Sequence, residues 1–150
     1  MPLPDFPASP PERFGVLAFD FGTQHIGMAY GQNLTGTAQP LDMLPARDGI
    51  PDWNRLEKVL GQWQPSLLLV GIPFNMDGSR SEMCARAEKF GRRLEARFRL
   101  PCYGIDERLS SAAAEELREG ENRRKSLDSL AAQIILESWF AELAQRSTAR

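Results

Sequence analysis

The fold is decided by the stretch VLAFDFGTQHIGMAYG, residues 16–31, which begins as a short apolar run with a carboxylate inside it. Such a run is typical of a buried strand, and strand alternation would place Val16, Ala18 and Asp20 on one face. An ionised carboxylate removed from water is costly unless it is paired or binds a metal. Two interpretations of Asp20 therefore stand side by side: a site carboxylate, or a residue that caps the turn at Gly22-Thr23.

The order of the expected elements gives the fold class. Three strands joined by short turns predict an antiparallel meander, and strands that are linked through helices predict parallel pairing with right-handed crossovers. We therefore predict an α/β fold with a five-stranded mixed sheet, an antiparallel three-strand meander plus two parallel strands, and helices on both faces. The expected strands are 16–20, 26–30, 37–44, 67–72 and 102–105, with 45–51 as a loop; the expected helices are 53–63, 79–100, 112–119 and 126–143.

Size and composition are those of one soluble domain. The chain has 150 residues, 42% hydrophobic and 25% charged, and no apolar run approaches the roughly 20 residues of a membrane helix. We predict a disordered, Pro-rich leader over residues 1–13 and a single domain over 14–146. Cys84 and Cys102 are most simply reduced thiols of a cytoplasmic protein.

The net charge of −2 argues against a protein that coats nucleic acid through its overall charge, but local basic patches remain open. One basic group runs from Arg86 to Arg99 with glutamates interleaved, and we interpret it as a solvated helix face. A second group, Arg123 to Lys125, is left open between a solvated loop and a substrate contact.

Acidic residues stand where predicted elements end. Asp20 ends the first strand, Asp106 and Glu107 follow the fifth, and Asp128 lies in the first turn of the last helix. Carboxylate oxygens suit Mg²⁺ or Mn²⁺, and two such ions about 4 Å apart can hydrolyse a phosphodiester. The plainer alternatives are that Asp128 offsets the helix dipole and that Glu107 pairs with a surface cation such as Arg108.

Two further features allow contact with a substrate. His25, the sole histidine, follows Asp20 and could touch a phosphate or protonate a leaving group, although an exposed turn residue is the simpler interpretation. The segment 71–78 contains an Asp-Gly turn. It could also form a rim that contacts nucleic acid through Asn75 and backbone amides.

Four motifs in this order resemble the YqgF/RuvX family of bacterial RNase H-like proteins. The resemblance covers about residues 14–143, and that family was first described as Holliday-junction resolvases and later as pre-16S rRNA nucleases. The motifs are Asp20-x-Gly22-Thr23-x-x-Ile26-Gly27, Val70-Gly71-Ile72-Pro73 with Asn75-Met76-Asp77-Gly78, Asp106-Glu107-Arg108-Leu109-Ser110, and Asp128-Ser129-x-Ala131-Ala132.

The resemblance implies an RNase H-like (RuvC-like) fold, a two-metal Mg²⁺ or Mn²⁺ site, a cytoplasmic location and a role in 5′-end maturation of small-subunit rRNA. Carried over by position, the metal-binding acids are Asp20, Asp106, Glu107 and Asp128, and we favour Glu107 over Asp106 because of its longer reach. In the broader superfamily the fourth strand commonly supplies an acid, and Val70-Gly71-Ile72-Pro73 has none. The expected substrate contacts are Thr23, His25, Asn75, Arg108, Arg124 and Lys125.

Competing functions follow from the same residues. The first is metal-dependent hydrolysis of structured RNA, with Asp20, Glu107 and Asp128 as catalytic residues. The alternatives are resolution of branched DNA, which usually needs a dimer, and a catalytically weak nucleic-acid-binding module. The expected partners are pre-rRNA or branched DNA, with no membrane and a monomer or weak homodimer. Residues 20–23 also resemble the phosphate loop of actin-like ATPases. We reject this interpretation because those enzymes enclose their nucleotide between two such domains, and a chain of 150 residues has room for one.

Overall fold

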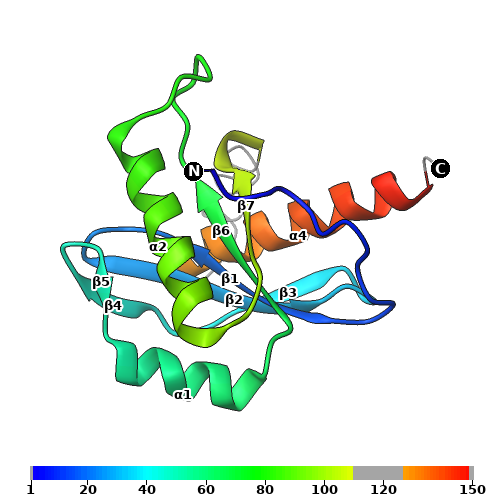
Figure 1. Cartoon of the computed structure of the whole chain (residues 1–150), viewed down its shortest axis with the longest axis horizontal. Helices are drawn as coiled ribbons and strands as arrows, with labels where there is room; N and C mark the ends of the chain where they lie inside the picture. Colours follow the sequence, from blue (N-terminus) through cyan, green and yellow to red (C-terminus); the bar gives the residue numbers. More distant parts are fainter. Residues whose placement is uncertain (1, 110–126, 149–150) are drawn as a thin grey trace.

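The computed structural model describes residues 2–109 and 127–148, and its centre is a mixed sheet (Figure 1). The strand order is β5-β4-β2-β1-β6-β7, and β3 also pairs with β2. The strands are β1 (Gly15–Asp20), β2 (His25–Gln32), β3 (Thr37–Pro40), β4 (Leu44–Arg47), β5 (Ile50–Pro51), β6 (Leu67–Ile72) and β7 (Cys102–Asp106). The predicted α/β class with a mixed sheet is confirmed.

Strand pairing places the end of β1 between an antiparallel neighbour, β2, and a parallel neighbour, β6. β1 pairs antiparallel with β2, where Asp20 lies opposite Gly27. On its other side β1 pairs parallel with β6, and β6 pairs parallel with β7. The carboxyl ends of β1, β6 and β7 therefore lie at one edge of the sheet.

Within the described residues the sheet has seven strands rather than the predicted five. The expected third strand, 37–44, divides into β3 and β4, which follow one another along the same side of β2. The expected loop 45–51 holds the β4–β5 hairpin, whose turn places Asp48 at φ 50° and Gly49 at φ 82°. The prediction failed here because these strands are short and contain prolines, a composition that is typical of turns.

Three α-helices and one 3-10 helix, η1 (Glu107–Leu109), are described. α1 (Trp53–Trp63) matches the predicted helix, and α4 (Leu127–Thr148) follows the predicted helix from residue 127, where the described residues resume, and ends later. α2 (Glu82–Phe98) is capped by Ser81, whose hydroxyl accepts from the Cys84 amide, and not by Ser79 as predicted. Ser79 instead donates its hydroxyl to Asp77 within the preceding loop. The helix predicted over 112–119 lies outside the described residues.

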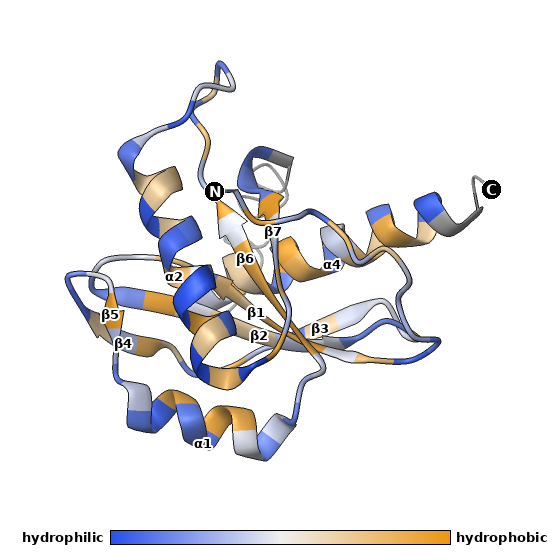
Figure 2. Ribbon diagram, viewed as in Figure 1, coloured by the Kyte–Doolittle hydropathy of each residue, from blue (hydrophilic) through white to orange (hydrophobic). Residues whose placement is uncertain are grey.

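The apolar core lies on both faces of the sheet. Leu17 and Phe19 of β1 face α1 and α2, whereas Val16 and Ala18 face α4 and its buried Trp139. The central strands and much of α4 are correspondingly hydrophobic (Figure 2). Because side chains alternate along a strand, this packing turns Asp20 toward the α4 face. No helix in the described part of the chain is long and apolar enough to cross a membrane.

The beginning of the chain packs on the protein, contrary to the predicted disordered leader. Leu3 is buried against Gly91 and Gly104, and the Gly104 amide donates to the Pro4 carbonyl. Phe6 stacks on Trp139 at 5.7 Å, and the Trp139 indole donates to the Asp5 carbonyl. The prolines suggested disorder, but two apolar side chains between them supply the contacts that hold residues 3–6 in place. The division into a leader and a domain at residue 14 stays a prediction.

Leu3→Ala should therefore lower the free energy of unfolding by about 2 kcal/mol, because it empties a buried apolar site. In a chain of this size that loss corresponds to about 4–8 °C in Tm, measured by thermal unfolding. Ser9→Ala, at an exposed position of the same segment, is the matched control and should leave Tm unchanged. Equal Tm values for wild type and Leu3→Ala would contradict the docking of the leader.

Candidate functional site

The candidate site is built around Asp20, whose neighbours on the adjacent strands lack side chains. Gly27 is its partner on β2, and Gly71 follows Val70, the residue of β6 that pairs with Phe19. A Cβ atom at Gly27 would lie 2.0 Å from the Asp128 carbonyl oxygen, and one at Gly71 would lie 2.7 Å from Glu107 Cγ. The two glycines thus let the first turn of α4 and the Glu107 side chain reach the sheet on either side of Asp20.

The first turn of α4 is fixed to the sheet as well as packed on it. Ser129 is fully buried, and its hydroxyl accepts a hydrogen bond of 3.3 Å from the Met28 amide of β2. Asp128 precedes it in the same turn. A single register of α4 on β2 therefore determines where the Asp128 carboxylate lies relative to Asp20.

The site concentrates negative charge. Burial raises the pKa of Asp20 far above its ordinary value, and the hydrogen bond and charge of Glu107 and the charge of Asp128 raise it further. All the contributions from described residues act in the same direction, so no cation among them offsets the shift. The Asp20 side chain still keeps part of its surface open to solvent. Glu107 is thus hydrogen-bonded to Asp20, and Asp128 lies near enough for its charge to act on Asp20, at a partly accessible end of the sheet.

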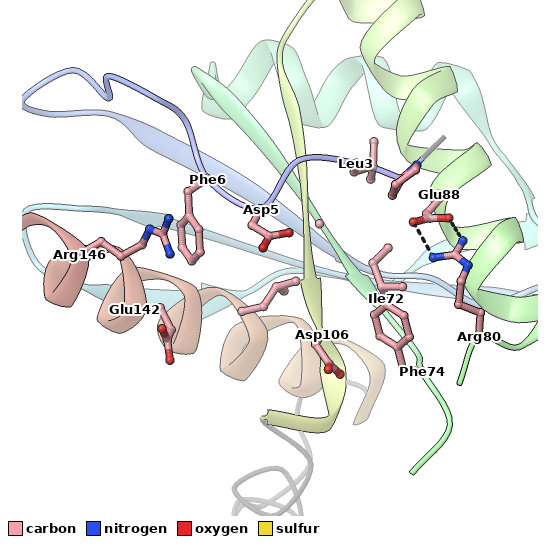
Figure 3. A pocket seen from close by; sticks show the side chains of 13 residues that line it. Leu3, Asp5, Phe6, Ile72, Phe74, Arg80, Glu88, Asp106, Glu142 and Arg146 are labelled. Carbon is pink, nitrogen blue, oxygen red and sulfur yellow. Dashed lines mark hydrogen bonds and ion pairs between the residues drawn. The ribbon is translucent and has the colours of Figure 1, made fainter. Parts of the chain in front are cut away.

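Asp106 lies apart from this group, although it precedes Glu107 directly. It ends β7 opposite Ile72, on the α2 face, and forms an ion pair of 2.6 Å with Arg108. The Arg108 side-chain hydrogen bond lowers the pKa of Asp106. Figure 3 shows Asp106 at a pocket of about 450 Å³ whose lining also includes Phe74 and the leader residue Asp5. Asp106 is the last residue of β7, and the chain turns into the 3-10 helix η1 at Glu107, whose side chain lies over Gly71 on the opposite face.

The donor set suits a hard cation that keeps water ligands. Among the residues that the structure describes, no group of three or more His, Cys, Asp or Glu side chains is arranged to hold a metal ion. Mg²⁺ needs fewer protein ligands, since it is commonly bound by one or two carboxylates together with water and substrate phosphate. The like charges around Asp20 favour any cation that neutralises them. Asp20, Glu107 and Asp128 fit that chemistry, whereas Asp106 is already neutralised by Arg108.

The predicted substrate-contact residues that the structure describes lie in three separate segments of the chain. Thr23 and His25 lie in and just after the β1–β2 turn, where the Thr23 carbonyl accepts from the Gly49 amide and His25 is exposed. Asn75 donates to the Ser79 hydroxyl in the exposed loop before α2. Arg108 donates to Asp106 and to the Met76 carbonyl of that loop. Arg124 and Lys125 lie outside the described residues.

Sequence reasoning missed the part played by the two glycines and by Ser129. A glycine inside a strand is a signal of close approach by another backbone or a ligand, and Gly27 and Gly71 both carried that signal. Ser129 carried none, because a serine in the first turn of a helix is commonplace and its bond to Met28 spans 101 residues of sequence.

Asp20→Asn should raise stability when divalent cations are removed with EDTA. A carboxyl whose pKa is raised in the folded state holds its proton more tightly there, so wild-type stability should fall as pH rises above the ordinary Asp pKa of about 4. An amide has no charge to bury, and we expect a gain at pH 8 of at least about 1.4 kcal/mol, the equivalent of one pKa unit. Thermal unfolding between pH 5 and pH 8 measures it. A variant that is equally or less stable than wild type at pH 8 would contradict the burial of this charge.

Comparison with known sequences gives a consistent family. Residues 15–142 match the sequence profile of the RuvX family, described as "Holliday junction resolvase". A protein of Marinobacter nauticus is 53% identical over 134 residues, 86% of this chain and 94% of its own length. One of Pseudomonas aeruginosa is 52% identical over 132 residues, 85% and 92% of the two chains. Both carry the name "Putative pre-16S rRNA nuclease".

Solved structures agree on the fold. T. thermophilus RuvC, in a complex with a Holliday junction substrate, superposes with a TM-score of 0.54 at 18% identity over 87% of this chain and 96% of RuvC. The yeast mitochondrial Holliday junction resolvase Ydc2 gives a TM-score of 0.56 at 12% identity over 97% of this chain and 83% of its own. At these identities the likeness concerns the fold, which is the predicted RuvC-like arrangement. Together with the sequence match across nearly the whole chain, it shows that this protein belongs to the RuvX (YqgF) family.

Proposed function

We propose that the chain is a divalent-metal-dependent nuclease that hydrolyses phosphodiester bonds of structured RNA, in 5′-end maturation of pre-16S rRNA. The observation that carries the proposal is the meeting of Asp20, Glu107 and Asp128 at the open carboxyl edge of the sheet. Such a group of carboxylates costs folding free energy. A function that needs a bound cation explains its presence.

The three acids act as one group in this proposal. Asp20, Glu107 and Asp128 would together hold the Mg²⁺ or Mn²⁺ ions, and Asp20 interacts with both of the other acids. A pair of such ions supplies an activated water and stabilises the leaving oxygen of the phosphodiester. The protein's own contribution is to orient the acids, through Gly71 under Glu107 and through the Ser129–Met28 bond beside Asp128.

The choice of RNA rests on the relatives named as pre-16S rRNA nucleases, which are about half identical to this chain. Work on pre-rRNA would place the protein in the cytoplasm. The second candidate is resolution of branched DNA, supported by the description of the family and by the fold shared with T. thermophilus RuvC. A resolvase acts on two strands related by two-fold symmetry and would need a dimer. The two candidates therefore differ in substrate and in oligomeric state.

The deciding experiment offers a 5′-extended small-subunit rRNA precursor and a four-way DNA junction to the purified protein with Mn²⁺. Cleavage of the RNA alone is the expected result. Cleavage of the junction alone would contradict the RNA nuclease proposal and favour resolution of branched DNA. Binding of RNA without cleavage of either substrate would favour a nucleic-acid-binding module.

In that assay Asp20→Asn, Glu107→Gln and Asp128→Asn should each reduce the cleavage rate at least about 100-fold, since removing a charge-stabilising group at a transition state costs about 3 kcal/mol. Asp106→Asn is the matched control: it removes the same charge one residue away, on the opposite face, and should keep the rate within about threefold. Equal losses in Asp106→Asn and Glu107→Gln would contradict the assignment of Glu107.

Gly71→Ala tests the geometry without removing any acid. Its methyl group would lie 2.7 Å from both Glu107 Cγ and Ile135 Cδ1, so the Glu107 carboxylate must move away from Asp20. We expect cleavage to fall at least about tenfold, because catalytic groups tolerate little displacement, while circular dichroism shows a folded protein. Gly61→Ala, where a Cβ meets nothing within 4 Å, is the control and should retain full activity. Full activity of Gly71→Ala would show that cleavage does not depend on the position of the Glu107 side chain over Gly71.

A further inference from the structure

A groove of about 220 Å³ lies between α2 and the β4–β5 hairpin, on the opposite face of the sheet from the carboxylate of Asp20. Its apolar floor is formed by Phe21 and Phe90, whose rings pack at 5.2 Å. Its walls carry charge. The lining residues are Phe21, Asp48, Gly49, Ile50, Arg86, Lys89, Phe90 and Arg93.

The charge of this groove is mainly positive. Three cations and one carboxylate line it. Arg86, Lys89 and Arg93 are spaced three and four residues apart, so they form one stripe along the exposed side of α2. Lys89 and Arg93 are solvent-exposed, and neither forms an ion pair with another described residue.

Arg86 is held in position before any ligand arrives. Its guanidinium donates to both the backbone carbonyl and the carboxylate of Asp48, at 3.0 and 2.9 Å. The turn that presents Asp48 is tight, since a Cβ atom at Gly49 would lie 3.0 Å from the Phe21 ring. A planar guanidinium fixed in this way still has donors left for an anion.

The groove is joined directly to the rim of the candidate site. Phe21, in its floor, is the residue after Asp20, and the Gly49 amide in its wall donates to the Thr23 carbonyl of the β1–β2 turn. Figure 1 shows α2 and the β4–β5 hairpin near the same end of β1. A polymer that crosses the end of β1 to reach Asp20 can therefore also contact the groove.

The sequence suggested a solvated helix face, and the exposure of Lys89 and Arg93 agrees with it. Of the interleaved glutamates, Glu88 is buried and pairs with Arg80, Glu95 accepts from the Cys102 amide, and Glu82 is exposed in the first turn of the helix. The ion pair with Arg80 therefore keeps Glu88 away from the cations at 86, 89 and 93.

We propose that this groove binds backbone phosphates of the RNA substrate beside the cleavage site, with Arg86, Lys89 and Arg93 as the contacts. The inference rests on the proposed nuclease function and assigns it a substrate-binding surface on the second face of the sheet. Phosphate is the ligand because clustered arginine and lysine side chains complement its charge and its oxygen geometry. Two or three adjacent cations suit a polyanion, and a nuclease with acids on one face needs cations elsewhere to hold such a substrate.

The test measures binding of the 5′-extended rRNA precursor in EDTA, by fluorescence anisotropy at several salt concentrations. The double variant Lys89→Gln/Arg93→Gln should bind at least about tenfold more weakly. Its plot of log affinity against log salt should be shallower by about 1.4–1.8, the value for two lost phosphate contacts. The double variant Arg55→Gln/Arg99→Gln removes two exposed arginines outside the groove and should bind like wild type.

Asp48→Asn should change RNA binding in the opposite direction, so it separates a charge effect from a loss of folding. Asparagine tolerates the positive φ of this position, and the change removes the only negative charge among the lining residues. RNA should bind about two- to fivefold more tightly, a gain that damage to the fold cannot produce.

The outcomes separate this inference from the proposed function. Unchanged RNA affinity and salt slope in Lys89→Gln/Arg93→Gln would contradict the proposal that the groove binds phosphates, even if the protein cleaves RNA. The same losses in the Arg55→Gln/Arg99→Gln control would also overturn it, because only overall charge would matter. The predicted weakening in a protein that does not cleave would support the groove while the nuclease proposal fails.

Discussion

The structure depends on the close approach of two elements to the end of β1, where glycines leave room for them. Gly27 admits the backbone of α4 at Asp128, and Gly71 admits the side chain of Glu107. Asp20 lies between them and carries the electrostatic cost, seen in its raised pKa. A chain selected for stability alone would fill these positions with apolar side chains. A group of acids with a raised pKa at such a place is what the proposed function would require.

The rest of the fold serves this arrangement. The buried face of α4, centred on Trp139, packs on β1 and β6 and fixes the height of the helix, while the Ser129–Met28 bond fixes its first turn. On the other face α2 packs on Phe19 and Phe21 and presents its cations beside the same strand end. The fourth predicted strand, β6, supplies no acid to the site. At Gly71 of this strand the side chain of Glu107, which follows β7, lies over the sheet.

Much of this could be predicted from the sequence, for identifiable reasons. The run Leu67–Ile72 is apolar on both faces, and Trp53–Trp63 repeats with helical spacing, so both elements were found with their observed bounds. The separation of Glu107 from Asp106 follows from the end of β7 at Asp106 and the start of η1 at Glu107. The hairpin at 44–51 and the docked leader were missed because proline obscured them, and their contacts depend on residues distant in sequence, such as Trp139 for Phe6. The pairing of Glu88 with Arg80 was not predicted either, since the burial of Glu88 is a tertiary property.

The central claim is that Asp20, Glu107 and Asp128 form a site that needs a divalent cation. Calorimetric titration of Mn²⁺ into the wild-type protein, Asp20→Asn and Asp106→Asn tests it most directly, without any assumption about the substrate. The account predicts saturable binding to wild type and to Asp106→Asn, and at least about tenfold weaker binding to Asp20→Asn. Binding that is equally strong in Asp20→Asn, or lost only in Asp106→Asn, would contradict the account and place the cation elsewhere in the protein.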